Sequence, residues 1–125
     1  MTQKSEIGKL GEDLACEYLK NKKYFILDRN FRRPWGELDI IAKYKDGTLV
    51  FVEVKTMNAS QELKPEDQAT SAKIKKLRRT ASLYAGRNQK LVKDKKGWRI
   101  DLVAINLGDL TNDKKDFQIR HYENI

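Results

Sequence analysis

The sequence predicts an α/β fold, in which a mixed β-sheet carries helices on its faces. Apolar residues recur at helical spacing in residues 5–21 and again in residues 71–88. Short runs rich in β-branched and aromatic residues lie between and after these two segments. The resulting order, α-β-β-β-α-β-β, places a helical crossover between the third and fourth strands. That pair is therefore expected to be parallel, next to an antiparallel hairpin.

The first helix is expected at residues 5–21, with Ser5 as a cap for its first turn. Its buried side is predicted to be a stripe of apolar residues three or four apart: Ile7, Leu10, Leu14 and Tyr18. Gly8 and Gly11 each cost roughly 1 kcal/mol relative to alanine inside a helix, which indicates close approach to another backbone or a ligand. Glu12 lies at the edge of the stripe, in a position to point into a groove.

Three strands are expected next, at residues 24–31, 35–44 and 49–55. The Asp-Gly sequence of "KDGT" predicts a hairpin turn between the last two. The third strand, "LVFVEVK", is apolar on both faces until Glu53, so it is expected at the centre of the sheet. Residues 56–70 are polar and lack periodicity, which is typical of a loop.

The second helix is expected at residues 71–88, with Gly86 as a stop signal near its end. Its buried side is predicted from four residues at helical spacing: Ile74, Leu77, Ala81 and Tyr84. A fourth strand is expected at residues 98–107, and a fifth, at an edge of the sheet, at residues 116–124. His121 falls in this last strand without a partner at metal-ligand spacing, so it is interpreted as a surface or edge-strand histidine.

Length and composition indicate a single small domain. The chain has 125 residues, which fits one domain with one core over residues 1–125. The single cysteine, Cys16, excludes an intramolecular disulfide and is typical of a reducing compartment, so a cytoplasmic location is expected. The first residues lack the apolar stretch of a signal peptide, and no run approaches the ~18 apolar residues of a membrane span. A membrane partner is therefore not expected.

The net charge of +8 is concentrated in one segment. Residues 71–100 contain eleven basic residues and one acidic residue, whereas the rest of the chain has a slight excess of acidic residues. Concentrated positive charge indicates a polyanionic partner such as nucleic acid, although a solvated helix face has the same composition. Lys75, Arg78 and Arg79 lie away from the predicted buried side of the second helix. Lys73 lies at the border of this buried side, where it could reach an active site on the sheet rather than point into solvent.

Four charged residues interrupt the apolar second and third strands: Glu37, Asp39, Glu53 and Lys55. Because side chains alternate along a strand, the two on each strand share a face. The hairpin turn then places Asp39 within about 5–8 Å of Glu53 across the ladder. Two carboxylates that close repel each other unless one is protonated or a cation lies between them. The pattern therefore predicts either a cation site or, in the alternative, an ordinary ion pair of Glu53 and Lys55.

A hard divalent cation, Mg²⁺ or Mn²⁺, would take oxygen ligands at this position. The candidate metal ligands are Asp39, Glu53 and the backbone carbonyl of Val54. Lys55 would lie beside the cation, where it could orient or deprotonate a water molecule. This arrangement suits phosphodiester hydrolysis, because the metal neutralises phosphate charge and lowers the pKa of water.

Sequence blocks along nearly the whole chain resemble the YraN-like family of small bacterial proteins. The blocks are "GKLGEDLACEYL" (8–19), "ILDRNFR" (26–32), "GELDIIA" (36–42), "FVEVK" (51–55), "KIKKLRRTASLY" (73–84), "RIDLVAI" (99–105) and "HYEN" (121–124). The "LD" and "EVK" motifs are similar to the metal-dependent nuclease motif of the restriction-endonuclease-like superfamily. The family is in turn similar to archaeal Holliday-junction resolvases. The resemblance implies a single nuclease-like domain with a restriction-endonuclease-like three-layer sandwich fold.

The resemblance also implies residue roles. The residues that match the catalytic positions of these nucleases are Glu12, Asp39, Glu53 and Lys55. Recurring family positions of unsettled role are matched by Arg29, Asn30, Arg32, Arg99 and Asp101. The residues expected to contact nucleic acid are Arg29, Arg32, Lys73, Lys75, Arg78 and Arg79. The family often has a basic residue two positions after the "EVK" triplet, where this chain has Met57, so a phosphate contact is expected to be missing there.

Three functions follow as hypotheses. The first is a metal-dependent endonuclease that hydrolyses phosphodiester bonds in structured or branched DNA. The second is a non-catalytic nucleic-acid-binding module of the same fold, and the third is a partner of larger DNA-processing machinery. Intact Asp39, Glu53 and Lys55 favour the first. DNA is the expected partner, and association of two copies into a homodimer is left open.

Overall fold

The computed structural model describes residues 3–57, 70–108 and 117–125, and the side chains from residue 6 onward within these ranges. Two α-helices, a short 3₁₀ helix and five strands occur in these ranges, in the order α1 (Gln3–Asn21), β1 (Tyr24–Arg33), β2 (Gly36–Tyr44), β3 (Leu49–Met57), α3 (Ser71–Arg87), η1 (Gln89–Leu91), β4 (Trp98–Asn106) and β5 (Gln118–Tyr122). Every helix and strand predicted from the sequence is present, with ends that differ by a few residues. Residues 56 and 57 extend β3 rather than starting a loop, and 58–69 lie outside the described residues.

The five strands form one mixed sheet in the order β1-β2-β3-β4-β5. β1, β2 and β3 pair antiparallel, β3 and β4 pair parallel, and β5 is antiparallel to β4. The parallel pair is the one that the chain reaches through α3, as predicted. The turn between β2 and β3 contains Gly47 at a φ of +97°, a backbone conformation that favours glycine. β3 is central, and its first four residues are at most 2% exposed.

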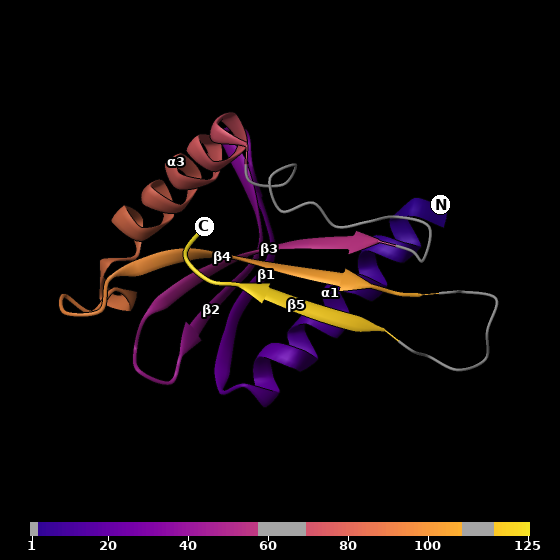
Figure 1. The fold of residues 1–125 in the computed structure, drawn as a ribbon. Coiled ribbons are helices and arrows are strands. Elements are labelled where there is room, and N and C mark those ends of the chain that lie inside the picture. The colour runs from indigo at the N-terminus through magenta and orange to yellow at the C-terminus, as the bar shows by residue number, and fades with distance from the viewer. Residues whose placement is uncertain (1–2, 58–69, 109–116) are drawn as a thin grey trace.

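The two helices cover opposite faces of the sheet, which gives the three-layer restriction-endonuclease-like sandwich (Figure 1). Ala15, Cys16 and Leu19 of α1 are buried in one core layer. Leu77 and Ala81 of α3 are buried in the other. No helix in the described ranges combines the length and the apolar character that crossing a bilayer requires.

Two details of the helices differ from the prediction. Leu10 was expected in the buried stripe of α1, but it is 44% exposed. The side of α1 that meets the sheet is instead centred on Gly11, Ala15 and Leu19, since the small residues allow the closest approach. α3 does not stop at Gly86 but continues to Arg87.

Candidate active site

The sheet forks where β2 and β3 separate. Their pairing ends at Ile40 and Val52, whereas β3 stays paired with β4 as far as Met57. Asp39 and Glu53 are the next residues beyond the last pair, so both lie where the fork opens. Asp39 Oδ2 accepts a hydrogen bond of 2.9 Å from the backbone N–H of Val54, in place of a ladder bond between the strands.

Both carboxylates face the side of the sheet that α3 covers. Ile41 and Phe51 pack in the core beneath α3. Asp39 lies two residues before Ile41 and Glu53 two residues after Phe51, so alternation directs both to this side. Both also line one cavity together with residues of α3. The prediction that these two residues share one face is confirmed.

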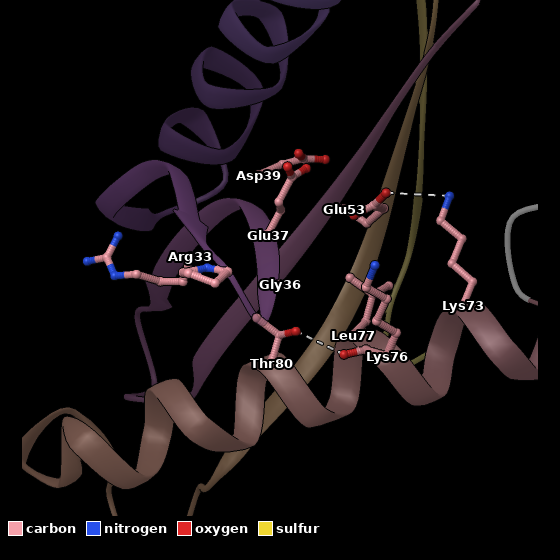
Figure 2. Close-up of a pocket in the computed structure, with 10 residues that line it drawn as sticks. Arg33, Gly36, Glu37, Asp39, Glu53, Lys73, Lys76, Leu77 and Thr80 are labelled. Atoms are coloured by element: carbon pink, nitrogen blue, oxygen red, sulfur yellow. Dashed lines mark hydrogen bonds and ion pairs between the residues drawn. The ribbon is translucent and has the colours of Figure 1, made fainter.

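A cavity of about 420 Å³ opens between the forked strands and α3. The residues that line it are Arg33, Pro34, Gly36, Glu37, Asp39, Glu53, Lys73, Lys76, Leu77 and Thr80. Figure 2 shows the carboxylates on the strand side of this cavity and the lysines on α3. Lys73 Nζ lies 3.5 Å from a carboxylate oxygen of Glu53, so Lys73 does reach the site, as its position at the border of the helix face suggested.

The electrostatics of the fork disfavour two negative charges. Burial, followed by the charge of Asp39, raises the pKa of Glu53 to about 7, even though Lys73 opposes the shift. Burial also raises the pKa of Asp39, with a further contribution from Glu37, while the Val54 N–H acts in the opposite direction. Charged carboxylates are therefore held here at a free-energy cost that a bound cation would remove.

Glu12, on the helix that covers the opposite face of the sheet, interacts electrostatically with Asp39. α1 packs so closely on β3 that a Cβ atom on Gly11 would collide with the side chain of Thr56. This contact explains why a helix tolerates glycine there, and it sets the position of the next residue, Glu12. Burial, followed by the charge of Asp39, raises the pKa of Glu12. Its Oε1 atom is buried and has no hydrogen-bond partner among the described residues.

These oxygens match the preferences of a hard divalent cation. A residue's N–H and C=O point to the same side of a strand. The N–H of Val54 points at Asp39, so its carbonyl is directed to the fork as well. The unpartnered oxygen of Glu12 and the raised pKa values of Asp39 and Glu53 indicate that Lys73 does not fully offset the negative charge of the group. Lys55 shares the α3 side of β3 with Glu53 by alternation, but it is not among the residues that line the cavity.

The residues predicted to contact nucleic acid fall into two groups. Lys75 and Arg79 are exposed on α3, and Arg78, also exposed, donates a hydrogen bond of 3.0 Å to the backbone oxygen of Ile125. Arg29 instead pairs with Asp13 of α1 at 2.8 Å, so it ties the first strand to the first helix. Arg32 lies 3.8 Å from Glu37 and is largely exposed.

A second buried carboxylate, Asp101, lies on the other side of the sheet and was not explained by the sequence analysis. It is fully buried and accepts hydrogen bonds from Arg99 at 2.9 Å, from the Asn124 backbone N–H at 3.0 Å, and from His121 at 2.8 Å. Tyr18 of α1 completes the chain of contacts through His121. The sequence did contain a signal for this buried site, namely an aspartate in the middle of the apolar run "RIDLVAI". The same kind of signal singled out Asp39.

The environment of His121 agrees only in part with the prediction from the sequence. It does lie on the edge strand β5, but its side chain is only 11% exposed and contacts both Asp101 and Tyr18. A possible metal-binding group is formed here by Asp101, His121 and Glu123, because one potential ligand atom from each lies within 4.8 Å of the other two. Asp101 is already satisfied by protein donors, however, and the Arg99 guanidinium supplies the positive charge. We therefore assign this group a structural role.

Comparison with known proteins places the chain in one family. Residues 11–105 match the family model described as uncharacterised protein family UPF0102. A UPF0102 protein of Thermodesulfovibrio yellowstonii is 42% identical over 120 residues, which cover 95% of this chain and 94% of the relative. One from Clostridium botulinum is 39% identical over 91% of this chain and 95% of its own length. One from Syntrophomonas wolfei is 47% identical over 63% of this chain and 68% of its own. The chain belongs to the UPF0102 family, which is the YraN family.

Proposed function

We propose that this protein is a metal-dependent endonuclease that hydrolyses phosphodiester bonds in structured or branched DNA. The observation that carries the proposal is the crowding of Asp39 and Glu53 at the fork of the sheet, with a raised pKa on each. A buried pair of this kind is costly for folding alone, and active sites are where such shifts concentrate. The unpartnered oxygen of Glu12 supports the same interpretation.

The chain has candidate ligands and basic groups for this chemistry. Asp39, Glu53 and the Val54 carbonyl would hold Mg²⁺ or Mn²⁺, with Glu12 as a further acidic group nearby. When bound, such a cation neutralises charge on the phosphate and lowers the pKa of water. Lys55 would orient the attacking water or, as the neutral amine, accept its proton at Nζ. Lys73, at the α3 side of the cavity, would turn from Glu53 to a phosphate oxygen of the substrate.

DNA is proposed as the substrate because the positive charge adjoins the cavity. Lys73 and Lys76 line it, and the exposed side of the same helix carries Lys75, Arg78 and Arg79. This arrangement would hold a phosphate backbone across the mouth of the site. The preference for structured or branched DNA rests on the likeness of the family to junction resolvases, and an enzyme acting on chromosomal DNA would work in the cytoplasm.

The second candidate function is a nucleic-acid-binding module without catalysis. One observation favours it: Lys73 lies 3.5 Å from Glu53 and so provides some of the positive charge that a metal would otherwise supply. A module of this kind would bind structured DNA equally well with and without divalent cations.

The test is a cleavage assay on linear, flapped and four-way DNA with Mg²⁺, Mn²⁺ or EDTA. We expect cleavage of at least one structured substrate with metal and none in EDTA. Asp39→Asn should abolish cleavage while binding of DNA is kept or strengthened, because one negative charge near the phosphate is removed. Glu17→Gln is the matched control, since Glu17 is an exposed carboxylate of α1 that pairs only with Lys20 among the described residues.

Two outcomes would decide against the proposal. Binding of structured DNA without cleavage under any divalent cation would favour the binding module. Equal cleavage by the wild type and Asp39→Asn would mean that the active site lies elsewhere or that the activity comes from a contaminant.

A further inference from the structure

A second, smaller cavity shares Arg33 with the carboxylate cavity and has a different chemistry. It measures about 120 Å³ and lies between the end of the β1–β2 hairpin and the last turns of α3. Its lining combines three aromatic side chains with two arginines: Phe31, Trp35, Tyr84, Arg33 and Arg87. No acidic residue is among its described lining, in contrast to the carboxylate cavity.

The aromatic rings and the guanidinium groups are already stacked on one another. The guanidinium carbon of Arg33 lies 4.3 Å from the ring centre of Phe31, and that of Arg87 lies 4.8 Å from the ring centre of Trp35. Tyr84 supports Phe31 edge-on, with ring centres 5.2 Å apart. Both arginines are exposed. Flat, charged groups held on aromatic rings at the surface are suited to stacking against a nucleobase.

Two further observations indicate a ligand here. Leu83, at the rim, is one of the few large apolar side chains that are exposed among the described residues, at 38%. The indole N–H of Trp35 is buried without a hydrogen-bond acceptor among those residues. Exposed apolar surface and an unsatisfied donor both cost free energy. A nucleobase in this cavity would cover the apolar surface of Leu83, and an acceptor atom on its edge would satisfy the indole N–H.

The two cavities form one track along α3. Arg33 lines both of them. Lys76 and Thr80 line the carboxylate cavity. Leu83 and Arg87, about one and two helical turns further along α3, line the aromatic cavity. The seven steps from Thr80 to Arg87 span about 10 Å of helix axis, which is about three stacked bases at 3.4 Å each.

We infer that this aromatic–arginine cavity binds an unpaired nucleobase of the DNA substrate, a few nucleotides from the phosphate held at the fork. The inference rests on the proposed function, since it specifies the substrate as DNA with a single-stranded or unstacked nucleotide beside the cut. A base inside an intact duplex cannot enter the cavity without leaving its stack, so the cavity selects flaps, ends or junctions over continuous duplex.

The test measures base-dependent binding in EDTA, where catalysis plays no part. Trp98→Phe leaves Trp35 as the only tryptophan, because the chain has two, and it keeps an aromatic ring against Phe51. The probes are a duplex with a short thymidine overhang, the same duplex with an abasic overhang, and a blunt duplex with the same number of phosphates. We expect the thymidine overhang alone to quench Trp35 fluorescence. It should also bind at least about fivefold more tightly than the abasic probe, the lower limit for stacking of one base.

Arg87→Ala should remove the preference for the thymidine overhang over the abasic one. Arg87→Lys should also lose most of it, because lysine keeps the charge but not the planar group. Arg120→Ala, on the exposed part of β5, is the matched loss of one arginine and should leave the preference unchanged. Equal binding of thymidine and abasic probes by the wild type would overturn the inference, as would equal effects of Arg87→Ala and Arg120→Ala.

The outcomes separate this inference from the proposed function. Metal-dependent cleavage without any base preference overturns the inference and leaves the nuclease proposal standing. A base preference without cleavage under any metal supports the inference and overturns catalysis. Absence of DNA binding overturns both.

Discussion

Two carboxylate groups among the described residues, the buried Asp101 and the half-buried pair Asp39 and Glu53 at the fork, differ in how the protein satisfies them. Burial alone would raise the pKa of Asp101, but hydrogen bonds from His121, Arg99 and the Asn124 N–H outweigh it and lower the pKa. At the fork, burial and the neighbouring Asp39 raise the pKa of Glu53 to about 7, although Lys73 is close by.

The difference lies in the number of donors that the protein itself supplies. Asp101 has a donor for each oxygen, and a permanent positive charge in Arg99. Asp39 accepts a backbone hydrogen bond from Val54, and Glu12 has a buried oxygen without a donor among the described residues. A carboxylate that is satisfied internally stabilises the fold, whereas carboxylates that are crowded and under-satisfied are suited to binding a cation. On this contrast we assign the Asp101 group a structural role and propose the fork as the functional site.

The largest effect is expected for the lysine that follows Glu53 on the same side of β3. Lys55→Ala should lower the rate of metal-dependent cleavage about 10²–10⁴-fold, the usual contribution of a general base or water-positioning group. Metal binding should remain, because the ligands are oxygens of other residues. Single-turnover cleavage and calorimetric titration with Mn²⁺ measure the two properties separately. Lys20→Ala, an exposed change on α1, is the control, and an undiminished rate for Lys55→Ala would remove that residue from the mechanism.

The next effect concerns the stability of the fold. Asp101→Asn should lower the free energy of unfolding by about 3–5 kcal/mol, because Arg99 is left without its buried partner. Asp39→Asn should cost little or even stabilise the metal-free protein, since it relieves a like-charge contact. Urea unfolding of both variants beside the wild type compares the two groups directly. Similar losses of stability for both would end the distinction between a structural and a functional carboxylate.

The third effect is a pH dependence with a defined sign. The pKa of Glu53 is raised from about 4.5 unfolded to about 7 folded, so between these values the folded state binds more protons. Stability of the metal-free protein should therefore fall as pH rises through this window. Glu53→Gln should flatten that dependence and stabilise the protein at pH 8 by roughly 1–3 kcal/mol. Thermal or urea unfolding from pH 5 to pH 8 in EDTA measures it, and a wild type that gains stability across this range through Glu53 would contradict the assignment.

Metal affinity should show the opposite trend at the same residue. Protons compete with the cation for Glu53 and Asp39, so Mn²⁺ should bind more tightly as pH rises toward 8. Calorimetric titration with Mn²⁺ at several pH values measures this trend, and an affinity independent of pH would place the cation away from these carboxylates.

The smallest effect concerns the basic side of α3. Replacing Lys75, Arg78 and Arg79 by Gln should lower the salt dependence of DNA binding, by up to about one unit of slope for each phosphate that these side chains neutralise. Binding measured over a series of salt concentrations gives the slope. An unchanged slope would assign this charge to solubility and would leave Lys73 and Lys76 as the only α3 lysines with a part at the site.

Local patterns were sufficient for the strands and for the placement of Asp39 and Glu53 on one face of the sheet. The Asp-Gly turn sets the hairpin register, and alternation then places both carboxylates on one face. Apolar residues on both faces of the third strand predicted its central place, and the helical crossover predicted its parallel neighbour. Side-chain periodicity is a property of the backbone, so these relations needed no knowledge of the rest of the fold.

Contacts between segments far apart in the sequence required the tertiary structure. The position of Glu12 beside Asp39 depends on the close contact of Gly11 with Thr56, and the partners of Asp101 include residues about 20 positions away in the chain. The buried side of α1 shifted away from Leu10 because the sheet, and not the most apolar stripe, decided which residues could approach.

Composition and short-range periodicity determined the elements, their order, and which charged residues would share a face. The tertiary structure decided which of the buried carboxylates were satisfied and which were not. That distinction depends on donors brought from other strands and helices, and packing alone sets their distances.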